Sequence, residues 1–144
     1  MARVRAAGGD TVGAVAALDL VPTTSRGYVE SRQQRAEVLL AGSAQDLTVL
    51  DQAMRTIERA QLDNPTRQRF TVRILQEALP VVTANGATPA SGTQATVGAH
   101  EATEKGVRDG LETALRSLAR ETNDLKERID LVNQANAVRN WSLT

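Results

Sequence analysis

The sequence has no cysteine and only one histidine, His100, among its 144 residues. The missing cysteines exclude a disulfide framework, a thiolate metal site and a cysteine nucleophile. The single histidine excludes a metal site built from several imidazole ligands. These two absences remove the commonest thiol and metal chemistries from consideration.

Aromatic residues and an excess of charge are also missing. Aromatics make up 2% of the chain, and 17 basic residues balance 17 acidic ones. Single-stranded nucleic acids are usually bound by stacking bases on aromatic rings, and duplexes by a net positive surface. No apolar run approaches the ~20 residues that span a bilayer. We therefore expect neither a nucleic acid nor a membrane as partner.

The residues that are abundant favour helix. Alanine occurs 22 times, and apolar residues make up 41% of the chain. Apolar side chains recur at helical spacing, and no stretch alternates long enough to predict a strand. The sequence therefore predicts an all-α fold of about six helices in a single domain over residues 1–144. The expected helices cover residues 10–20, 28–41, 46–61, from 64 to a kink or end at Pro80, from 104 onward, and a last one carrying Leu125, Ile129, Val132 and Val138 on its buried stripe.

Capping residues predict where these helices begin and end. Gly42 stands where a left-handed helix end is common. Asn64 followed by proline predicts a helix that is capped by Asn64 and begins at Pro65. We expect Thr122 or Asn123 to cap the last helix, in which Asp124 would pair with Arg128.

Residues 83–103 differ in composition from the rest of the chain. Glycine, alanine, threonine, serine and proline dominate this segment, which has no apolar period. We predict one long flexible surface loop here. His100 falls inside it, and we interpret it as a solvated histidine.

Both ends of the chain invite a hypothesis. Residues 2–7 look like the last turns of a helix whose beginning is missing, because no capping residue precedes them. We interpret the chain as the C-terminal part of something longer. In the tail, Trp141 and Leu143 are candidates to anchor on a neighbour or to pack back on the last helix.

Two blocks of sequence indicate a particular repeat architecture. Residues 7–22 have the glycine turn, the small alanines and the Val-Pro exit of the second helix in a tetratricopeptide repeat. Such repeats stack helical hairpins into a right-handed α-solenoid. Residues 7–22, 106–120 and 136–139 together resemble the tetratricopeptide region of the actinobacterial serine/threonine protein kinase G family.

The resemblance implies a parent with a rubredoxin-like metal-binding segment and a kinase domain, which uses ATP and Mg²⁺, ahead of this helical domain. It implies a cytoplasmic kinase that phosphorylates a forkhead-associated (FHA) regulator of 2-oxoglutarate dehydrogenase. The tetratricopeptide region would support dimerisation, the stability of its own kinase domain and substrate docking. The sequence contains none of the kinase motifs, so we expect no catalytic, cofactor-binding or metal-binding residue in this chain.

Arginine offers the one candidate binding group. Arginine outnumbers lysine 15 to 2. Arg67, Arg69 and Arg73 cluster around one helix, with Arg55 and Arg59 on the helix before it. Guanidinium groups can hold a carboxylate or phosphate of a partner. We predict partner binding by Arg55, Arg59, Arg69 and Arg73, with an ordinary salt-bridged surface as the alternative.

Two function classes follow. The first is a non-catalytic interaction domain that binds protein partners: its own kinase domain, the FHA-domain substrate or a second copy. The alternative is a stand-alone helical ligand-binding protein or enzyme that uses the 83–103 loop as a lid over an arginine-lined cleft.

Overall fold

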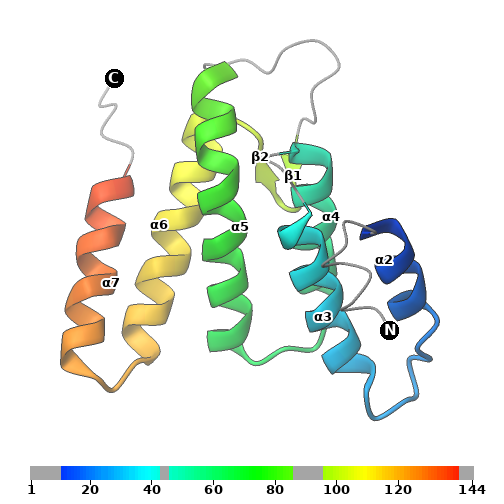
Figure 1. Cartoon of the computed structure of the whole chain (residues 1–144). Helices are drawn as coiled ribbons and strands as arrows, with labels where there is room; N and C mark the ends of the chain where they lie inside the picture. Colours follow the sequence, from blue (N-terminus) through cyan, green and yellow to red (C-terminus); the bar gives the residue numbers. More distant parts are fainter. Residues whose placement is uncertain (1–10, 43–45, 86–95, 140–144) are drawn as a thin grey trace.

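The computed structural model describes residues 11–42, 46–85 and 96–139, including the backbone but not the side chains of residues 11, 12 and 85. The expected helix end at residues 2–7 and the tail with Trp141 and Leu143 lie outside this part. The described residues form six helices and one short hairpin (Figure 1). The elements are α2 (Thr11–Asp19), α3 (Tyr28–Ala41), α4 (Leu47–Arg59), α5 (Asn64–Asn85), β1 (Thr96–Val97), β2 (His100–Glu101), α6 (Glu104–Glu121) and α7 (Leu125–Val138).

Consecutive helices run in opposite directions and lie side by side (Figure 1). The most extensive helix contacts all join neighbours in the sequence, from α2 with α3 to α6 with α7. This nearest-neighbour stacking is the architecture of an α-solenoid. The all-α prediction and the expected number of helices are confirmed. None of the described helices has the length and apolarity needed to cross a membrane.

The apolar stripes predicted for α4 and α6 form the centre of the core. Their leucine, isoleucine, methionine and valine side chains pack against the inner faces of α3 and α5. The largest side chains with almost no exposed surface are Leu50, Met54, Ile57, Ile74, Leu75, Leu111, Leu115, Val82, Val97 and Val107. Burying each of the large aliphatic side chains contributes about 1.5–3 kcal/mol.

Side-chain caps mark the beginning of α4, α6 and α7. Asp46 accepts a hydrogen bond from the Thr48 backbone N–H at 2.9 Å, and Thr103 accepts one from Gly106 at 3.0 Å. Gly42 ends α3 with a φ of −99°, so the predicted left-handed end is wrong. Its backbone N–H still bonds the Val38 carbonyl at 3.1 Å, so that carbonyl is satisfied without a left-handed residue.

Asp63, and not Asn64, caps α5. Its carboxylate accepts hydrogen bonds from the Thr66 hydroxyl at 2.7 Å and the Thr66 N–H at 3.3 Å. These bonds lower the pKa of the Asp63 carboxyl below its usual value. The Asn64 amide instead reaches across to α6, where it donates to Glu121 at 2.6 Å. The prediction failed because Asp63, one residue earlier, already caps the helix, and the Asn64 side-chain oxygen accepts from the Gln68 amide at 3.2 Å instead of from a backbone N–H.

Pro80 does not end α5, which continues to Asn85. Proline removes one backbone hydrogen bond and normally breaks a helix. Here Ala78 and Val82, which are 0% and 1% exposed, flank the proline and pack into the core. Their burial keeps the chain helical beyond Pro80, so the predicted loop is helical at residues 83–85.

The other end of the predicted loop is an ordered hairpin between α4 and α6 (Figure 1). Strands β1 and β2 pair antiparallel, with Thr96 opposite Glu101. Gly98 has a φ of +61°, which glycine adopts readily. On α6, Gly106 leaves room for the Glu101 backbone, and a side chain at Gly110 would meet the His100 ring. Gly106 and Gly110 thus let strand β2 lie close to α6, and Gly110 also leaves room for the Leu75 side chain of α5.

Helix α7 lies at the edge of the stack. Leu125 is 69% exposed and Ile129 is 52% exposed, and Ala135 is the one fully buried residue among the described side chains of α7. The predicted buried stripe is therefore wrong at Leu125 and Ile129 but right at Val138, and α7 packs through Leu131, Ala135 and Val138. Its N-cap is Asp124, which accepts from the Lys126 N–H at 3.1 Å, and not Thr122 or Asn123. Arg128 donates to the Thr122 carbonyl at 2.8 Å instead of pairing with Asp124.

Candidate protein-interaction surface

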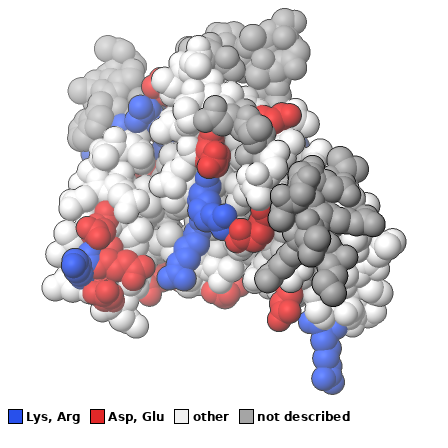
Figure 2. Space-filling view, in the orientation of Figure 1, with Lys and Arg blue, Asp and Glu red and all other residues white. Residues whose placement is uncertain are grey.

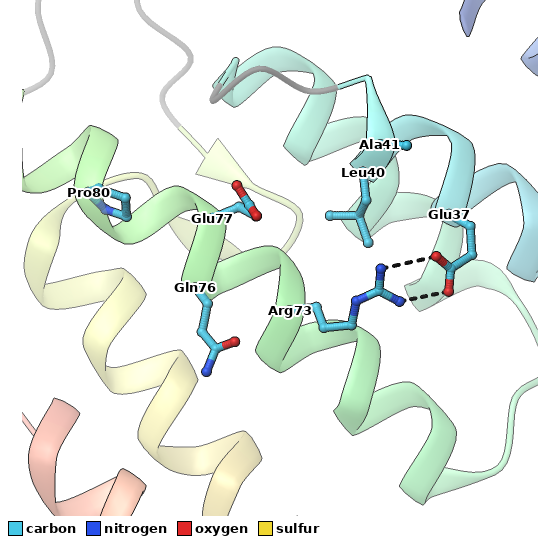
Figure 3. Close-up of a pocket in the computed structure, with 7 residues that line it drawn as sticks. All are labelled: Glu37, Leu40, Ala41, Arg73, Gln76, Glu77 and Pro80. Atoms are coloured by element: carbon cyan, nitrogen blue, oxygen red, sulfur yellow. Dashed lines mark hydrogen bonds and ion pairs between the residues drawn. The ribbon is translucent and has the colours of Figure 1, made fainter. Parts of the chain in front are cut away.

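A groove runs between α3 and α5 on the surface of the helix stack. One part, with a volume of about 450 Å³, is lined by apolar, acidic, amide and basic side chains from both helices (Figure 3). These residues are Glu37, Leu40, Ala41, Arg73, Gln76, Glu77 and Pro80. A second part of about 550 Å³ shares Glu37 and adds Glu30, Gln33, Gln34 and Phe70. We call both parts together the α3/α5 groove.

An ion pair crosses the α3/α5 groove. Arg73 donates to both carboxylate oxygens of Glu37, at 2.7 and 3.0 Å (Figure 3). This hydrogen bonding raises the pKa of Arg73 above its usual value, so the guanidinium remains charged. Both side chains are about half exposed, so the pair contributes only about 0.2–1 kcal/mol to stability. Because the pair contributes so little, Arg73 can exchange Glu37 for a partner's carboxylate, and Glu37 can exchange Arg73 for a partner's guanidinium, at little cost in free energy. The bidentate geometry suits both exchanges.

Apolar surface accompanies the charges in the groove. Phe70 lies below Arg73, whose guanidinium carbon is 5.6 Å from the ring centroid. Leu40 and Pro80 face the other part of the groove from opposite helices (Figure 3). Apolar patches beside fixed charged groups are typical of surfaces that bind protein segments. The groove therefore has the composition of a peptide-binding surface.

The four predicted arginines do not form one cluster. Arg73 lies in the α3/α5 groove, and Arg69 points toward α7, where it approaches Glu127 at 3.9 Å. Arg55 and Arg59 line a separate hollow between α2, α3 and α4. Arg55 pairs with Asp51 one turn earlier on α4 at 3.0 Å. The structure thus divides these residues among three places.

Several residues at these places were not predicted from the sequence. Glu37, which pairs with Arg73, lies on a different helix 36 residues away. Arg32 and Arg35 line the hollow with Arg55 and Arg59. The i, i+3 spacing of Arg32 and Arg35 places them on one face of α3, and this spacing was the available signal. The sequence spacing does not show which helix this face of α3 packs against, because that depends on how the helices stack.

The described part of the 83–103 segment does not form a lid over the arginine-lined hollow, because none of its residues lines that hollow. The hairpin is instead fixed to α4. Asp51 accepts a hydrogen bond from the Gly98 N–H at 2.7 Å, and Glu58 accepts one from Ala99 at 2.9 Å. His100 is half-buried against α6 instead of solvated. Within the described ranges, no three histidine, aspartate or glutamate side chains gather as metal ligands do.

Charges of both signs alternate over the face shown in Figure 2, without a broad patch of one sign. Stacked antiparallel helices with a mixed apolar and charged groove define a helical-repeat domain of the tetratricopeptide type. The chain belongs to the protein kinase G tetratricopeptide repeat family, whose model matches residues 1–142.

Two curated relatives carry the same name, serine/threonine-protein kinase PknG. The chain is 34% identical over 142 residues to that of Mycobacterium leprae and 32% identical over 145 residues to that of Mycolicibacterium smegmatis. These alignments cover 96% and 99% of the chain but only 18% of each relative. The chain therefore spans less than a fifth of the length of the curated relatives it matches.

Proposed function

We propose that this chain is a non-catalytic interaction domain of a serine/threonine protein kinase of the PknG type. The family match over residues 1–142 carries this proposal. It is supported by the names of the two relatives, of each of which the chain spans 18%. The cytoplasmic location that the resemblance implies belongs to the same proposal.

The sequence does not contain the catalytic motifs of such a kinase. The chain has one histidine, which precedes glutamate, and one phenylalanine, which follows arginine. The His-Arg-Asp and Asp-Phe-Gly motifs of protein kinases therefore cannot be formed. The ATP and Mg²⁺ of the reaction have no binding motif here, so we assign no catalytic step to these residues.

Substrate docking is the role that we assign to the α3/α5 groove. The Glu37 carboxylate and the Arg73 guanidinium are both about half exposed, so each can pair with a group of the partner. Leu40 and Pro80 supply apolar contact beside them. The parent kinase would phosphorylate an FHA-domain regulator of 2-oxoglutarate dehydrogenase, and the groove would hold that regulator near the kinase domain.

Self-association and support of the kinase domain complete the proposal. Leu125 and Ile129 on α7 leave apolar surface exposed at one edge of the stack. Exposed apolar edges of helical repeats commonly contact a further repeat or a partner. We assign this edge to a homodimer, and contacts with the parent's own kinase domain to the remaining surface.

Binding and phosphate transfer test the docking role together. The purified 144-residue chain is incubated with labelled ATP and the FHA-domain regulator, and affinity for the regulator is measured by titration calorimetry. We expect binding without phosphate transfer. Gln76→Arg places a long cation in the groove and should weaken binding by about tenfold, because it blocks the apolar contacts.

Gln134→Arg is the matched control, since Gln134 is an exposed glutamine on α7 outside the groove. It should change the affinity by less than about twofold. Robust phosphate transfer by the chain alone would refute the non-catalytic role. Equal weakening by both variants would refute docking in the α3/α5 groove.

A further inference from the structure

A second concave site, which we call the arginine hollow, lies between α2, α3 and α4. It has a volume of about 330 Å³. Four arginines line it together with one aspartate and three neutral polar or aromatic residues. These residues are Asp19, Tyr28, Arg32, Arg35, Gln52, Arg55, Thr56 and Arg59. No residue of the α3/α5 groove takes part, so this site is independent of the docking proposal.

Arg32 and Arg35 form a rigid wall of the arginine hollow. Their side chains are only 14% and 19% exposed, and both donate to the same oxygen of Asp19, at 3.0 and 2.9 Å. Arg32 also donates to the Leu18 carbonyl at 2.8 Å and lies over the Tyr28 ring. Arg35 reaches the Thr56 hydroxyl on α4. These contacts fix two guanidinium groups before any ligand arrives.

Arg55 and Arg59 line the hollow from α4. Arg55 donates to Asp51 through Nε, and within the described residues its two Nη atoms make no hydrogen bond. The Arg59 side chain is exposed and makes no hydrogen bond or ion pair with any residue that the structure describes. Their i, i+4 spacing places both on one face of α4. Two guanidinium groups therefore keep donors available for a ligand.

The charges around the arginine hollow do not balance, although the chain as a whole is neutral. Four arginines face Asp19, and among the residues that the structure describes Asp51, beneath Arg55, is the one further carboxylate paired with them. Like charges held this close repel each other, and an anion that enters relieves the repulsion. The surplus of two positive charges matches a phosphate monoester, which carries about −1.5 to −2 at neutral pH.

We propose that the arginine hollow binds a phosphoryl group, with Arg55 and Arg59 as its direct ligands and Arg32 and Arg35 as the fixed cationic wall. A phosphate offers three oxygens in different directions and thus accepts from arginines on two helices at once. A carboxylate has two oxygens in one plane and a single charge. Arg32 and Arg35 already have a carboxylate partner in Asp19. The phosphoryl group can come from a phosphorylated protein segment or from a small phosphate compound.

Titrations of the whole chain followed by NMR test this proposal. The probes are a peptide of otherwise neutral residues with one phosphoserine, the same peptide with serine, the same peptide with glutamate, and inorganic phosphate. We expect the phosphopeptide to shift the Nε–Hε signals of Arg55 and Arg59, while the serine and glutamate peptides leave them in place. Arg59→Gln should weaken phosphopeptide binding by about tenfold, because it removes charge-assisted hydrogen bonds.

Arg120→Gln is the matched control. Arg120, like Arg59, is an exposed arginine in the last turn of its helix, but it lies on α6 away from the hollow. It should change the affinity by less than about twofold. Circular dichroism checks that both variants fold, and Arg55→Gln provides a second ligand variant.

The outcomes separate the sources of the phosphoryl group. Tighter binding of the phosphopeptide than of inorganic phosphate supports a protein-borne group, and equal binding supports a small phosphate compound. Equal binding of the glutamate peptide would overturn the proposal in favour of general carboxylate binding. An absence of shifts with every probe, or equal weakening by Arg59→Gln and Arg120→Gln, would overturn it as well.

Discussion

Helices α6 and α7 follow each other in the sequence and have similar patterns, yet they differ in how they pack. Both begin at a side-chain cap, and both carry leucine, valine or isoleucine at helical spacing. In α6 the predicted stripe is buried, with Leu111 at 0% and Leu115 at 1% exposure. In α7 the predicted stripe includes Leu125 and Ile129, which are more than half exposed.

The number of neighbours explains this difference. Helix α6 is contacted by α5, α7 and strand β2, whereas the extensive contacts of α7 are with α6. An apolar period predicts that a helix forms and which residues share a face. It does not predict how many elements will cover that face. The apolar period therefore specifies the helix and its apolar face in both α6 and α7, whereas the stacking of neighbouring elements decides whether that face is buried.

The largest expected effect comes from shortening a leucine in α6. Leu111→Ala should lower the free energy of unfolding by about 2–5 kcal/mol, because it leaves a cavity among fully buried side chains. Leu125→Ala in α7 is the matched control and should cost less than about 1 kcal/mol, since that side chain is mostly exposed. Urea denaturation followed by circular dichroism measures both. Equal losses would show that Leu125 is covered in solution.

Removing the caps should give a smaller effect that again differs between the helices. Thr103→Ala deletes the hydrogen bond to Gly106 in α6 and should lower the global free energy of unfolding by about 1 kcal/mol. Asp124→Ala deletes the corresponding bond to Lys126, but α7 can fray by itself. We expect its main effect in faster amide hydrogen exchange confined to α7.

Thr113→Ala, at an exposed position within α6, is the control for the cap substitutions and should not destabilise the protein. If Asp124→Ala accelerated exchange equally in α4 and α7, the independent fraying of α7 would be excluded.

The smallest expected effect on stability comes from the exposed residues of α7. The double variant Leu125→Ser, Ile129→Ser should change the free energy of unfolding by no more than about 0.5 kcal/mol per site. It should nevertheless shift a homodimer toward monomer in sedimentation equilibrium, because it removes the apolar edge. Leu20→Ser, at a position that is 82% exposed elsewhere, is the control. A wild-type chain that stays monomeric at every concentration would count against dimerisation through α7.

Local patterns were sufficient to predict most of the helices. Helix α3 spans the predicted residues 28–41, and α6 begins at the predicted Glu104. The failures occur where a tertiary contact decides. Val82 keeps the helix intact beyond Pro80, and Asp51 binds the hairpin.

The candidate binding residues were predicted less well for a related reason. Composition and helical spacing identified Arg55, Arg59, Arg69 and Arg73 as residues able to bind a partner. They could not show that Arg73 meets Glu37 across a groove, or that Arg55 and Arg59 meet Arg32 and Arg35. Those meetings depend on how neighbouring helices are rotated about their axes, which the sequence pattern leaves open.

The hairpin attached to α4 also bears on how this domain unfolds. In a simple solenoid each unit contacts only its neighbours, so the array can open at one interface while the rest stays folded. Here Asp51 on α4 bonds Gly98, 47 residues away, and the paired strand β2 packs on α6. The hairpin thus connects α4 to α6 through contacts that do not involve α5. We expect α4, α5 and α6 to unfold as one cooperative unit, with α7 free to detach before them.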